Sequence, residues 1–426
     1  MDDLYTSQRQ KLLPPASTQK LLTALAAKLY LGEQFQFQTS LIPLANDDLQ
    51  LRFSGDPTLT SKDIRKLFSQ YKAQYGNEIL GDIWLDNSAF SGYQKASGWP
   101  WDITGVCYSA PSAAISLDHN CVQGAIYSDN AVGKLTRVHV PDFQPITVTS
   151  TAKITAKQEN TPQSPQPECQ LELTPSPDNH YLISGCLQQR KKPLPLKFAI
   201  QNTEKYSQFV ISRELKSLNI QWRGHFKLGQ PHSESINQAI THHSAPLPEL
   251  LSVMLKKSDN LYADNITKTI GARFYQQAGT FSNGIAAIKA ILQQHHIDLS
   301  NAVIADGSGL SRNNRLTAQQ LSDVMSYIYH HDQQLKLIDL LPVSGVSGTL
   351  KYRKSINQAP FKGQIQGKSG TIYGSHNLVS IVTSKNGEKY LVVQLVSNYF
   401  PSQPEEPRNW QLINFEQSLY RSLINH

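Results

Sequence analysis

Three short motifs, in order along the chain, supply the side chains of a serine acyl-transfer enzyme. They are Ser17-Thr18-Gln19-Lys20, Ser258-Asp259-Asn260 and Lys368-Ser369-Gly370. A serine with a lysine three residues later can act as nucleophile and base, because positions i and i+3 share a helix face. The second motif adds a hydroxyl and an amide, and the third adds a cation beside a hydroxyl and a glycine. The set indicates a hydrolase that uses lysine where others use histidine.

The segment around the first motif has the pattern of a helix that begins near Ser17. Residues 17–29 consist of strong helix formers, and an extended stretch that ends at Pro14-Pro15 precedes them. Leucines recur with helical spacing at Leu21, Leu22, Leu25 and Leu29. Backbone N–H groups at a helix N-terminus favour developing negative charge. We therefore predict that Ser17 and Lys20 meet at the start of this helix.

Other stretches share these patterns, and local sequence separates them from the motifs. Ser150 and Lys153 lie in segment 146–154, which alternates like a strand, so their side chains should point to opposite faces. Ser69 lies in the middle of a predicted helix and is interpreted as a surface residue. Further Ser-x-Asn triplets begin at Ser128, Ser311 and Ser375. The triplet at Ser258 differs because it lies between two helical patterns, 250–255 and 261–266, and we predict a connection between helices.

The third motif belongs to a predicted antiparallel sheet. Segment 362–373 reads as a strand with glycines where a backbone or substrate must come close. Segments 377–383 and 390–396 read as two further strands, joined by a turn at Asn386-Gly387. An amphipathic helix, about 410–424, follows and is expected to pack on the sheet.

The motif order and the flanking sequence resemble the penicillin-binding proteins. Within them the chain resembles the penicillin-binding protein 4 type, the class C low-molecular-mass D-alanyl-D-alanine carboxypeptidases and endopeptidases of Gram-negative bacteria. The stretches that carry the resemblance begin at Pro15, Gly98, Cys107, Leu255 and Ala305 and read PASTQK, GWPW, CYSAP, LKKSDN and ADGSGLSR. The family usually has Lys-Thr-Gly at the third motif. Ser369 keeps the hydroxyl and loses a methyl group, so we expect reduced rigidity and retained chemistry.

The resemblance implies an α/β (α+β) fold class: a serine β-lactamase/transpeptidase-like domain, with an antiparallel sheet flanked by helices, and two smaller, strand-rich inserted domains. The interval from Ser17 to Ser258 is much longer than that from Ser258 to Lys368, and this also indicates an insertion. We expect residues 1–45 and 243–426 to form the catalytic domain, 46–121 and 191–242 inserted domain II, and 122–190 a nested domain III. The proline-rich segment 157–167 is expected to be a loop or hairpin tip.

The chemistry assigns a role to each motif residue. Ser17 would attack the carbonyl between two D-alanines, and Lys20 must be neutral to accept its proton. We expect Lys368 and desolvation to lower the pKa of Lys20. Ser258 would relay a proton to the leaving amine, and Asn260 would hold the substrate amide. No metal or organic cofactor is expected.

The substrate-binding residues come from the resemblance. It implies that the backbone N–H groups of Ser17 and Thr371 form the oxyanion hole, and that Lys368, Ser369 and Gly370 receive the terminal carboxylate. It also maps a pocket for the zwitterionic end of a diaminopimelate side chain onto three further positions, Asp102, Tyr108 and Arg312. The alternative is that these three are ordinary surface residues. Tyr373 stands where a family example has glutamine, so side-chain specificity is left open.

The four cysteines favour an oxidising compartment. They fall as two close pairs, Cys107 with Cys121 and Cys169 with Cys186. Three connectivities are possible, and we expect sequential pairing because each pair flanks its own turn-rich segment. Four reduced thiols are the alternative. Zinc is not expected because no Cys-x-x-Cys is present.

Charge and targeting signals limit the expected partners. The net charge of +7 comes from dispersed lysines and arginines, which argues against nucleic acid and suits an anionic cell-wall polymer. We expect peptidoglycan peptides and β-lactam antibiotics as ligands. The sequence has no transmembrane run, so any membrane contact would be peripheral, and the oligomeric state is open, a homodimer included. The periplasm is the expected location. Because only sixteen residues precede Ser17 and no signal peptide is seen, we expect a processed chain or a truncated reading frame.

Two other function classes share the motifs. A serine β-lactamase would deacylate penicillin quickly, and the long insertion argues against it. A penicillin sensor or weakly catalytic wall-binding protein would not need the intact set of Ser17, Lys20, Ser258, Asn260 and Lys368. We also expect these motifs to converge on a sheet that lacks the N-terminal strand of the family, with one edge less well paired.

Overall fold

The computed structural model describes residues 4–156, 169–232, 238–400 and 409–426. Its contacts divide the chain into two compact units. One unit comprises Met1–Gln36, Ala89–Gly98 and Ala245–His426 and carries all three motifs, so we call it the motif unit. The other comprises Phe37–Ser88 and Trp99–Ser244, and we call it the insert unit.

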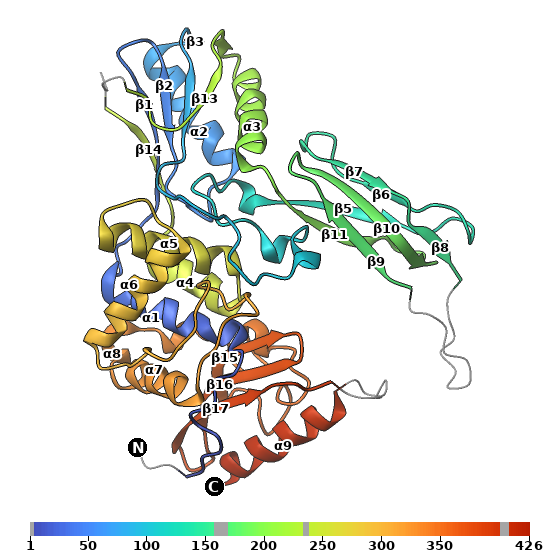
Figure 1. Cartoon of the computed structure of the whole chain (residues 1–426), viewed down its shortest axis with the longest axis vertical. Helices are drawn as coiled ribbons and strands as arrows, with labels where there is room; N and C mark the ends of the chain where they lie inside the picture. The colour runs from blue at the N-terminus through green and yellow to red at the C-terminus, as the bar shows by residue number, and fades with distance from the viewer. Residues whose placement is uncertain (1–3, 157–168, 233–237, 401–408) are drawn as a thin grey trace. The chain divides into compact units, whose positions relative to one another are not determined.

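The motif unit consists of helices around a three-stranded antiparallel sheet (Figure 1). Its helices are η1 (Ala16–Gln19), α1 (Lys20–Tyr30), α4 (Leu247–Lys256), α5 (Asn260–Tyr275), α6 (Phe281–Gln294), α7 (Ala318–His330), α8 (Asp332–Leu335), η5 (Ile338–Leu340), η6 (Gly348–Leu350) and α9 (Trp410–Asn425). Its strands are β15 (Ile365–Ile372), β16 (Ser375–Thr383) and β17 (Lys389–Val396), in that order. Among the described residues, no strand from the N-terminal segment joins this sheet.

The predicted helix and strands around the motifs are confirmed. Every residue of α1 from Lys20 to Lys28 is buried, and α1 packs against α4, α5, α6 and α7. The turn between β16 and β17 contains Asn386 and Gly387. Helix α9 packs on β16, and its Tyr420 and Ile424 belong to a buried apolar cluster with residues of the sheet. The fold class is therefore the predicted one.

A buried ion pair joins α9 to the segment around Arg353, which precedes β15 in the chain. Glu416 is 2% exposed and accepts hydrogen bonds from Arg353, from the Ser355 hydroxyl and from Gln394 Nε2. Burial alone would raise the pKa of Glu416, but the Arg353 hydrogen bond and charge outweigh burial and lower it. The ionised pair is thus part of the folded structure at neutral pH.

The insert unit is rich in strands, as predicted. Its strands are β1 (Gln38–Pro43), β2 (Leu49–Arg52), β3 (Glu78–Ile79), β4 (Ile83–Asp86), β5 (Cys121–Tyr127), β6 (Arg137–His139), β7 (Thr147–Ser150), β8 (Lys153–Thr155), β9 (Leu171–Pro175), β10 (His180–Gln188), β11 (Leu194–Ala199), β12 (Gln221–Trp222), β13 (Phe226–Leu228) and β14 (Ile240–His243). Its helices are α2 (Ser61–Tyr75), η2 (Trp101–Ile103), η3 (Cys107–Ser109), η4 (Asp118–Asn120) and α3 (Thr203–Ser217). The largest sheet has the order β13-β4-β2-β1-β14, and α2 contacts β1 and β14 of this sheet.

The boundaries between the two units fall at different residues from the domain boundaries expected from the sequence. Strand β1 pairs with β2 and β14, so residues 37–45 lie in the insert unit. Residues 89–98 return to the motif unit, where Ser91 N–H bonds to Gly279 O and Arg312 N–H to Gly98 O. The finer division into domains II and III stays a prediction. The expected loop at 157–167 lies outside the described residues.

The two other Ser-x-x-Lys pairs, Ser69 with Lys72 and Ser150 with Lys153, lie in the insert unit, away from any helix start. Ser69 is exposed in the middle of α2, nine residues after its N-cap at Thr60. Ser150 ends β7, while Lys153 begins β8, and the Ser150 hydroxyl bonds to the Thr136 hydroxyl at 2.6 Å. Segment 146–154 was predicted as one strand, and the structure instead contains two strands, β7 and β8, with residues 151–152 between them.

The cysteines are paired sequentially in the structure. Cys107 is bonded to Cys121, and Cys169 to Cys186. This agrees with the expected connectivity and excludes the four-thiol alternative for the structure. The first bridge joins η3 to the start of β5, and the second joins β10 to the chain just before β9.

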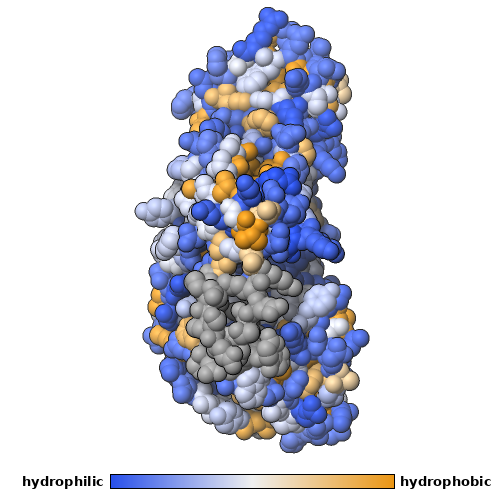
Figure 2. All heavy atoms as spheres, turned by 90° about the vertical axis from the view of Figure 1, so that its right-hand side faces the viewer, coloured by the Kyte–Doolittle hydropathy of each residue, from blue (hydrophilic) through white to orange (hydrophobic). Residues whose placement is uncertain are grey.

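The molecular surface is mainly polar on the face that Figure 2 displays, with apolar side chains in small separate groups. Over the described ranges, no helix has both the length and the apolar character needed to cross a membrane.

Candidate active site

The Ser17 turn is fixed to the sheet by backbone contacts. The Thr18 hydroxyl donates to Pro15 O at 2.7 Å, which closes the turn η1. Asn377 Nδ2, on β16, donates to both Pro14 O and Pro15 O at 2.9 Å. The prolines therefore end the preceding segment at a defined place on the sheet, and the nucleophile turn follows directly.

Lys20 lies beneath Ser17 and has three acceptors. Its Nζ donates to Ser17 Oγ at 2.9 Å, to Asn260 Oδ1 at 2.6 Å and to Ser308 O at 2.7 Å. Lys20 is fully buried, while Ser17 is partly exposed. The base is thus shielded from water, and the hydroxyl that it would activate remains accessible.

Burial is the main influence on the Lys20 amine. Desolvation lowers the pKa of Lys20 to about 8, although the negative charges of Asp264, Asp306 and Asp259 oppose the shift. The predicted effect of desolvation is confirmed. Lys368 is not among the named causes of the Lys20 shift, so its predicted effect on Lys20 is not borne out. Instead, burial and then the charges of Lys20 and Arg353 hold the pKa of Lys368 well below its usual range.

The second and third motifs meet through Lys368. Its Nζ donates to Ser258 Oγ at 2.8 Å and to Ser369 O at 2.7 Å. Ser258 lies in the connection between α4 and α5, as predicted, and its φ of 58° is in the left-handed region that serine rarely adopts. Helix α5 begins at Asn260, which places the amide of the second motif on Lys20.

Gly370 brings the third motif against the nucleophile turn. A Cβ at this position would lie 2.7 Å from Pro15 O and 3.0 Å from Ser17 N, so only glycine allows the approach. Together with the Lys20–Asn260 and Lys368–Ser258 bonds, this contact brings the three motifs to one place. Ser369 presents its hydroxyl to the Thr349 hydroxyl at 2.7 Å, and Thr371 is exposed next to it on β15.

The loop of residues 305–311 packs against the first motif. Asp306 Oδ1 accepts from Gly309 N–H and from Asn314 Nδ2, and its Oδ2 accepts from Ser311 N–H. A Cβ on Gly309, whose φ is +81°, would lie 1.9 Å from Ala16 O. The glycine therefore lets this loop touch the backbone that carries Ser17.

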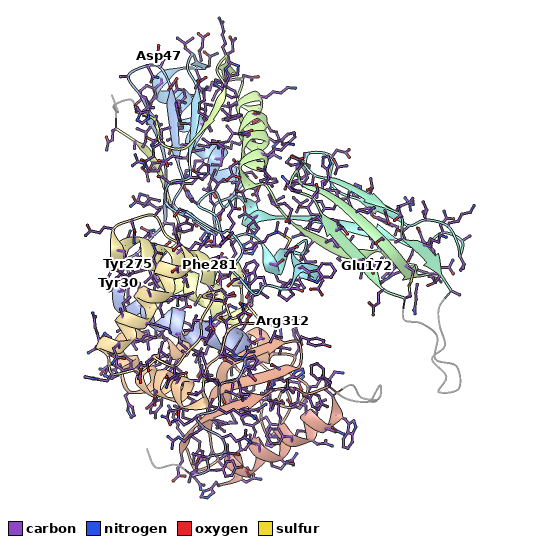
Figure 3. All side chains as sticks on the ribbon, viewed as in Figure 1. Tyr30, Asp47, Glu172, Tyr275, Phe281 and Arg312 are labelled. Carbon is purple, nitrogen blue, oxygen red and sulfur yellow. A yellow bond between two sulfur atoms is a disulfide. The ribbon has the colours of Figure 1, made fainter. Side chains whose placement is uncertain are left out.

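The residues expected to bind the substrate side chain lie in different units. Asp102, in η2, and Tyr108, in η3, are exposed on the insert unit. Arg312, which Figure 3 labels, is exposed on the motif unit. Its guanidinium lies over the Tyr373 ring, 5.1 Å from the ring centroid. Their common role in binding stays a prediction.

Sequence reasoning missed several groups of this site. The Ser308 carbonyl and the Thr349 hydroxyl contact motif residues, but a backbone carbonyl has no sequence signal. Asp264 accepts from Gly307 N–H at 2.9 Å and acts on Lys20 through its charge. Its place one turn after Asn260 on α5, four residues along, was the available signal.

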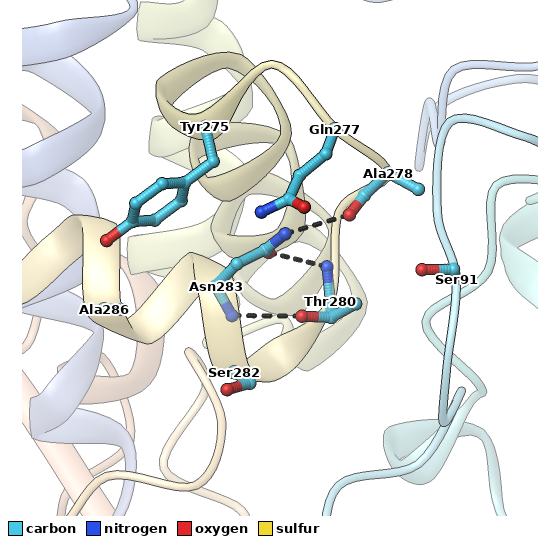
Figure 4. A pocket seen from close by; sticks show the side chains of 8 residues that line it. All are labelled: Ser91, Tyr275, Gln277, Ala278, Thr280, Ser282, Asn283 and Ala286. Atoms are coloured by element: carbon cyan, nitrogen blue, oxygen red, sulfur yellow. Dashed lines mark hydrogen bonds between the residues drawn. The ribbon is translucent and has the colours of Figure 1, made fainter.

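A polar pocket of about 390 Å³ lies elsewhere in the motif unit, between the end of α5 and the start of α6 (Figure 4). It is lined by Ser91, Tyr275, Gln277, Ala278, Thr280, Ser282, Asn283 and Ala286, none of which belongs to the motifs. Asn283 is engaged in capping α6 with Thr280. Within the described part of the chain, no group of three or more histidines, cysteines or acids is arranged to hold a metal ion.

Known proteins resemble the chain over nearly its whole length. Residues 2–417 match the D-Ala-D-Ala carboxypeptidase 3 (S13) family. The D-alanyl-D-alanine carboxypeptidase DacB of Haemophilus influenzae is 35% identical over 420 residues, which cover 96% of this chain and 86% of the relative.

Solved structures agree with the sequence match. The crystal structure of penicillin binding protein 4 (dacB) from H. influenzae has a TM-score of 0.91 at 34% identity and covers 99% of this chain and 94% of its own. The same protein complexed with a novel β-lactam has a TM-score of 0.86 at 33% identity, with coverage of 99% and 93%. The chain belongs to the D-Ala-D-Ala carboxypeptidase 3 (S13) family of serine peptidases.

Proposed function

We propose that this chain is a D-alanyl-D-alanine carboxypeptidase and endopeptidase that acts on peptidoglycan stem peptides and crosslinks through an acyl-enzyme on Ser17. The observation that carries the proposal is the contact of Ser17 Oγ with the Lys20 amine at 2.9 Å, with Lys20 buried and its pKa lowered to about 8 by that burial. An appreciable neutral fraction of Lys20 is therefore available near neutral pH, and this fraction can accept a proton.

The first half-reaction transfers the acyl group to the enzyme. Ser17 Oγ gives its proton to Lys20 Nζ and forms a bond with the carbonyl carbon of the penultimate D-alanine. The carbonyl oxygen becomes an oxyanion held by the backbone N–H groups of Ser17 and Thr371. The C–N bond then breaks, and the leaving amine receives a proton through Ser258, which Lys368 contacts at 2.8 Å.

The second half-reaction consumes one water. Water adds to the ester of Ser17, and the C–O bond to Oγ breaks. The acid product and the free serine result, so the two steps add up to hydrolysis of one amide bond. Asn260 accepts a hydrogen bond from the Lys20 amine, and in both steps it would also hold the substrate amide.

The substrate carboxylate would bind at the third motif. Lys368 is buried, and its pKa is lowered chiefly by that burial, with the Lys20 charge next. A bound carboxylate would favour the ammonium form of Lys368, and the hydroxyl of Ser369 would add a hydrogen bond. Asp102, Tyr108 and Arg312 are the proposed contacts of a diaminopimelate side chain.

The location and the other ligand follow the same proposal. A peptidoglycan peptidase with two disulfides requires an oxidising compartment, and we propose the periplasm. A β-lactam resembles the D-alanyl-D-alanine amide, and the H. influenzae relative has been solved with one. We therefore propose that β-lactams acylate Ser17.

Purified muropeptides test the proposal. Wild-type protein should release D-alanine from pentapeptides and cleave crosslinked dimers, which liquid chromatography with mass spectrometry can follow. Ser17→Ala and Lys20→Ala should release no D-alanine. Ser69→Ala and Ser150→Ala, which change the serines of the other Ser-x-x-Lys pairs, should match wild type. Full activity of Ser17→Ala would reject the assignment.

A further inference from the structure

We propose that Thr349 is a positioning residue for Ser369, whose hydroxyl it holds in the orientation that receives the terminal carboxylate of the substrate. The inference rests on the proposed function of the third motif as the carboxylate site. Thr349 lies in η6, 20 residues before Ser369, and belongs to none of the three motifs.

The hydroxyl of Ser369 is not fixed by its own side chain. Serine has a single heavy atom on Cβ, so its χ1 angle can occupy three staggered positions, whereas a β-branched residue such as threonine is restricted. Ser369 is partly exposed on β15, and Thr371, two residues along on the same face, is exposed as well. The orientation of the Ser369 hydroxyl therefore depends on a contact from another segment.

Thr349 makes this contact. Its Oγ1 lies 2.7 Å from Ser369 Oγ, the usual length of a hydrogen bond between two hydroxyls. Each hydroxyl has one proton, so the pair uses one proton and leaves one. When Thr349 donates to Ser369, the remaining proton is that of Ser369. A hydroxyl that accepts one hydrogen bond donates the next more strongly.

The chemistry of this group matches a carboxylate. An ionised carboxylate only accepts hydrogen bonds, and the hydroxyl pair has one proton to give. The Lys368 amine donates to Ser369 O at 2.7 Å, so a cationic group and this hydroxyl belong to adjacent residues of β15. A hydrogen bond to a charged acceptor is stronger than one between neutral groups, so the aim of the hydroxyl matters for binding.

The segment that carries Thr349 is fixed to the sheet. Gly367 N–H, on β15, donates to Pro342 O at 2.9 Å. Leu350, the next residue after Thr349, is fully buried in an apolar cluster that includes Ile365 of β15. The backbone on the C-terminal side of Thr349 therefore has a defined place beside the third motif.

The same segment is also fixed to α4. Gly348 has a φ of 57°, and a Cβ at this position would lie 2.8 Å from Lys256 O, at the last residue of α4. Thr349 is itself β-branched, so its χ1 angle is restricted. A stiff side chain on a fixed backbone thus supplies the orientation that the serine side chain lacks.

The test measures recognition of the carboxylate. Wild type and Thr349→Val are compared on an N-acylated peptide ending in D-alanyl-D-alanine and on the same peptide with a C-terminal amide. Valine keeps the shape of threonine and loses the hydroxyl. Loss of one hydrogen bond between neutral groups corresponds to about fivefold in an equilibrium constant. We expect the acid-to-amide ratio of kcat/KM to fall by about fivefold, mainly through a higher KM for the acid.

Two further variants test the route through Ser369. In the Ser369→Thr background, the β-branched residue restricts its own χ1 angle, so Thr349→Val should lower the acid-to-amide ratio less than it does in wild type. Thr349→Ser keeps the hydroxyl and should keep most of the wild-type ratio. If Thr349→Val does not fold, Thr349→Ala makes the same comparison.

A matched control comes from the same segment. The Ser347 hydroxyl accepts a hydrogen bond from Val343 N–H at 3.1 Å, within its own turn. Ser347→Ala therefore removes a hydroxyl two residues from Thr349 that is bonded away from Ser369. It should lower the melting temperature and leave the acid-to-amide ratio unchanged.

Three outcomes would overturn the inference. A wild-type ratio in Thr349→Val would mean that Thr349 does not act on the carboxylate site. Equal losses of kcat/KM on the acid and the amide would mean a structural role only. An equal fall of the ratio with and without Ser369→Thr would mean that Thr349 does not act through Ser369. Failure of the proposed function gives a different result, since wild-type protein would then cleave neither peptide.

Discussion

Gly309→Ala should uncouple the nucleophile from its base. The added Cβ would lie 1.9 Å from Ala16 O, 2.4 Å from Ala16 C and 3.1 Å from Ser17 N. Real Cβ atoms essentially never approach closer than 3.0 Å, so the loop and the Ser17 turn must separate. Both carry part of the site, because the loop supplies Ser308 O to Lys20 and the turn supplies Ser17 Oγ.

The required movement sets the expected size of the effect. The Cβ and the Ala16 oxygen must move apart by about 1 Å, and a displacement of that size at a reacting group costs about 100-fold in rate. The left-handed φ of +81° adds a cost in stability of roughly 1–2 kcal/mol for alanine. We therefore expect acylation to slow by about 100-fold, with a lower melting temperature.

Gly32→Ala separates the two effects. Gly32 follows α1 with a φ of +79°, and nothing lies within 4 Å of its added Cβ, so it has the backbone cost without the collision. Gly32→Ala should lose only the stability that the backbone strain costs, Gly309→Ala should lose more because of the collision, and only Gly309→Ala should lose acylation, measured as the rate constant with a fluorescent penicillin. Equal acylation by the two variants would refute the contact between the loop and the Ser17 turn.

Three further predictions use other parts of the motif unit. Because Lys20 acts as a neutral base with a pKa of about 8, the acylation rate of wild type should rise as pH increases from 6 to 9, and a rate that falls over this range would exclude Lys20 as the base. Ser369→Thr should keep at least wild-type acylation, because its hydroxyl can still reach the Thr349 hydroxyl, and a large loss of activity would assign the wrong role to Ser369. Arg353→Met should destabilise the fold by about 3–5 kcal/mol in denaturant titrations at pH 7, because it leaves buried Glu416 unpaired. The pKa of Glu416 is lower in the folded state, so its stabilising contribution is full above the unfolded pKa and is lost as pH falls through the folded pKa. The stability difference between wild type and Arg353→Met should therefore shrink in acid. A stability difference that is constant with pH would contradict this linkage.

The sequence predicted those parts of the fold whose signal is local. The leucines of α1, the alternating strands β16 and β17 and the Asn386-Gly387 turn each depend on spacing within one segment, and all three are confirmed. The convergence of the three motifs was predicted from their order and flanking residues, which resemble a known family. That resemblance supplied the long-range information that periodicity lacks.

The rest depended on contacts between segments distant in sequence. The pairing of β1 with β14 joins residues some 200 positions apart, so the boundary of the insert unit could not be read from composition. Segment 89–98 belongs to the motif unit through backbone bonds such as Arg312 N–H to Gly98 O, which any residue type could make.

The candidate site was predicted as side chains, and the missing groups are mostly backbone. Ser308 O and the amides of Gly307 and Gly309 position Lys20, and only the glycines leave a trace in the sequence, within Asp306-Gly-Ser-Gly. The prediction for the pKa of Lys20 also left out the acids around it. Asp264 is brought close only by tertiary packing, and its charge acts against the lowering of the Lys20 pKa by burial.

Mapping of the penicillin adduct tests the central claim most directly. Wild-type protein is incubated with penicillin, digested and analysed by tandem mass spectrometry. One added penicilloyl group is expected, located on Ser17 in the peptide that contains it, with no adduct in Ser17→Ala. An adduct on Ser69, Ser150 or Ser258, or D-alanine release by a protein that forms no adduct on Ser17, would contradict it.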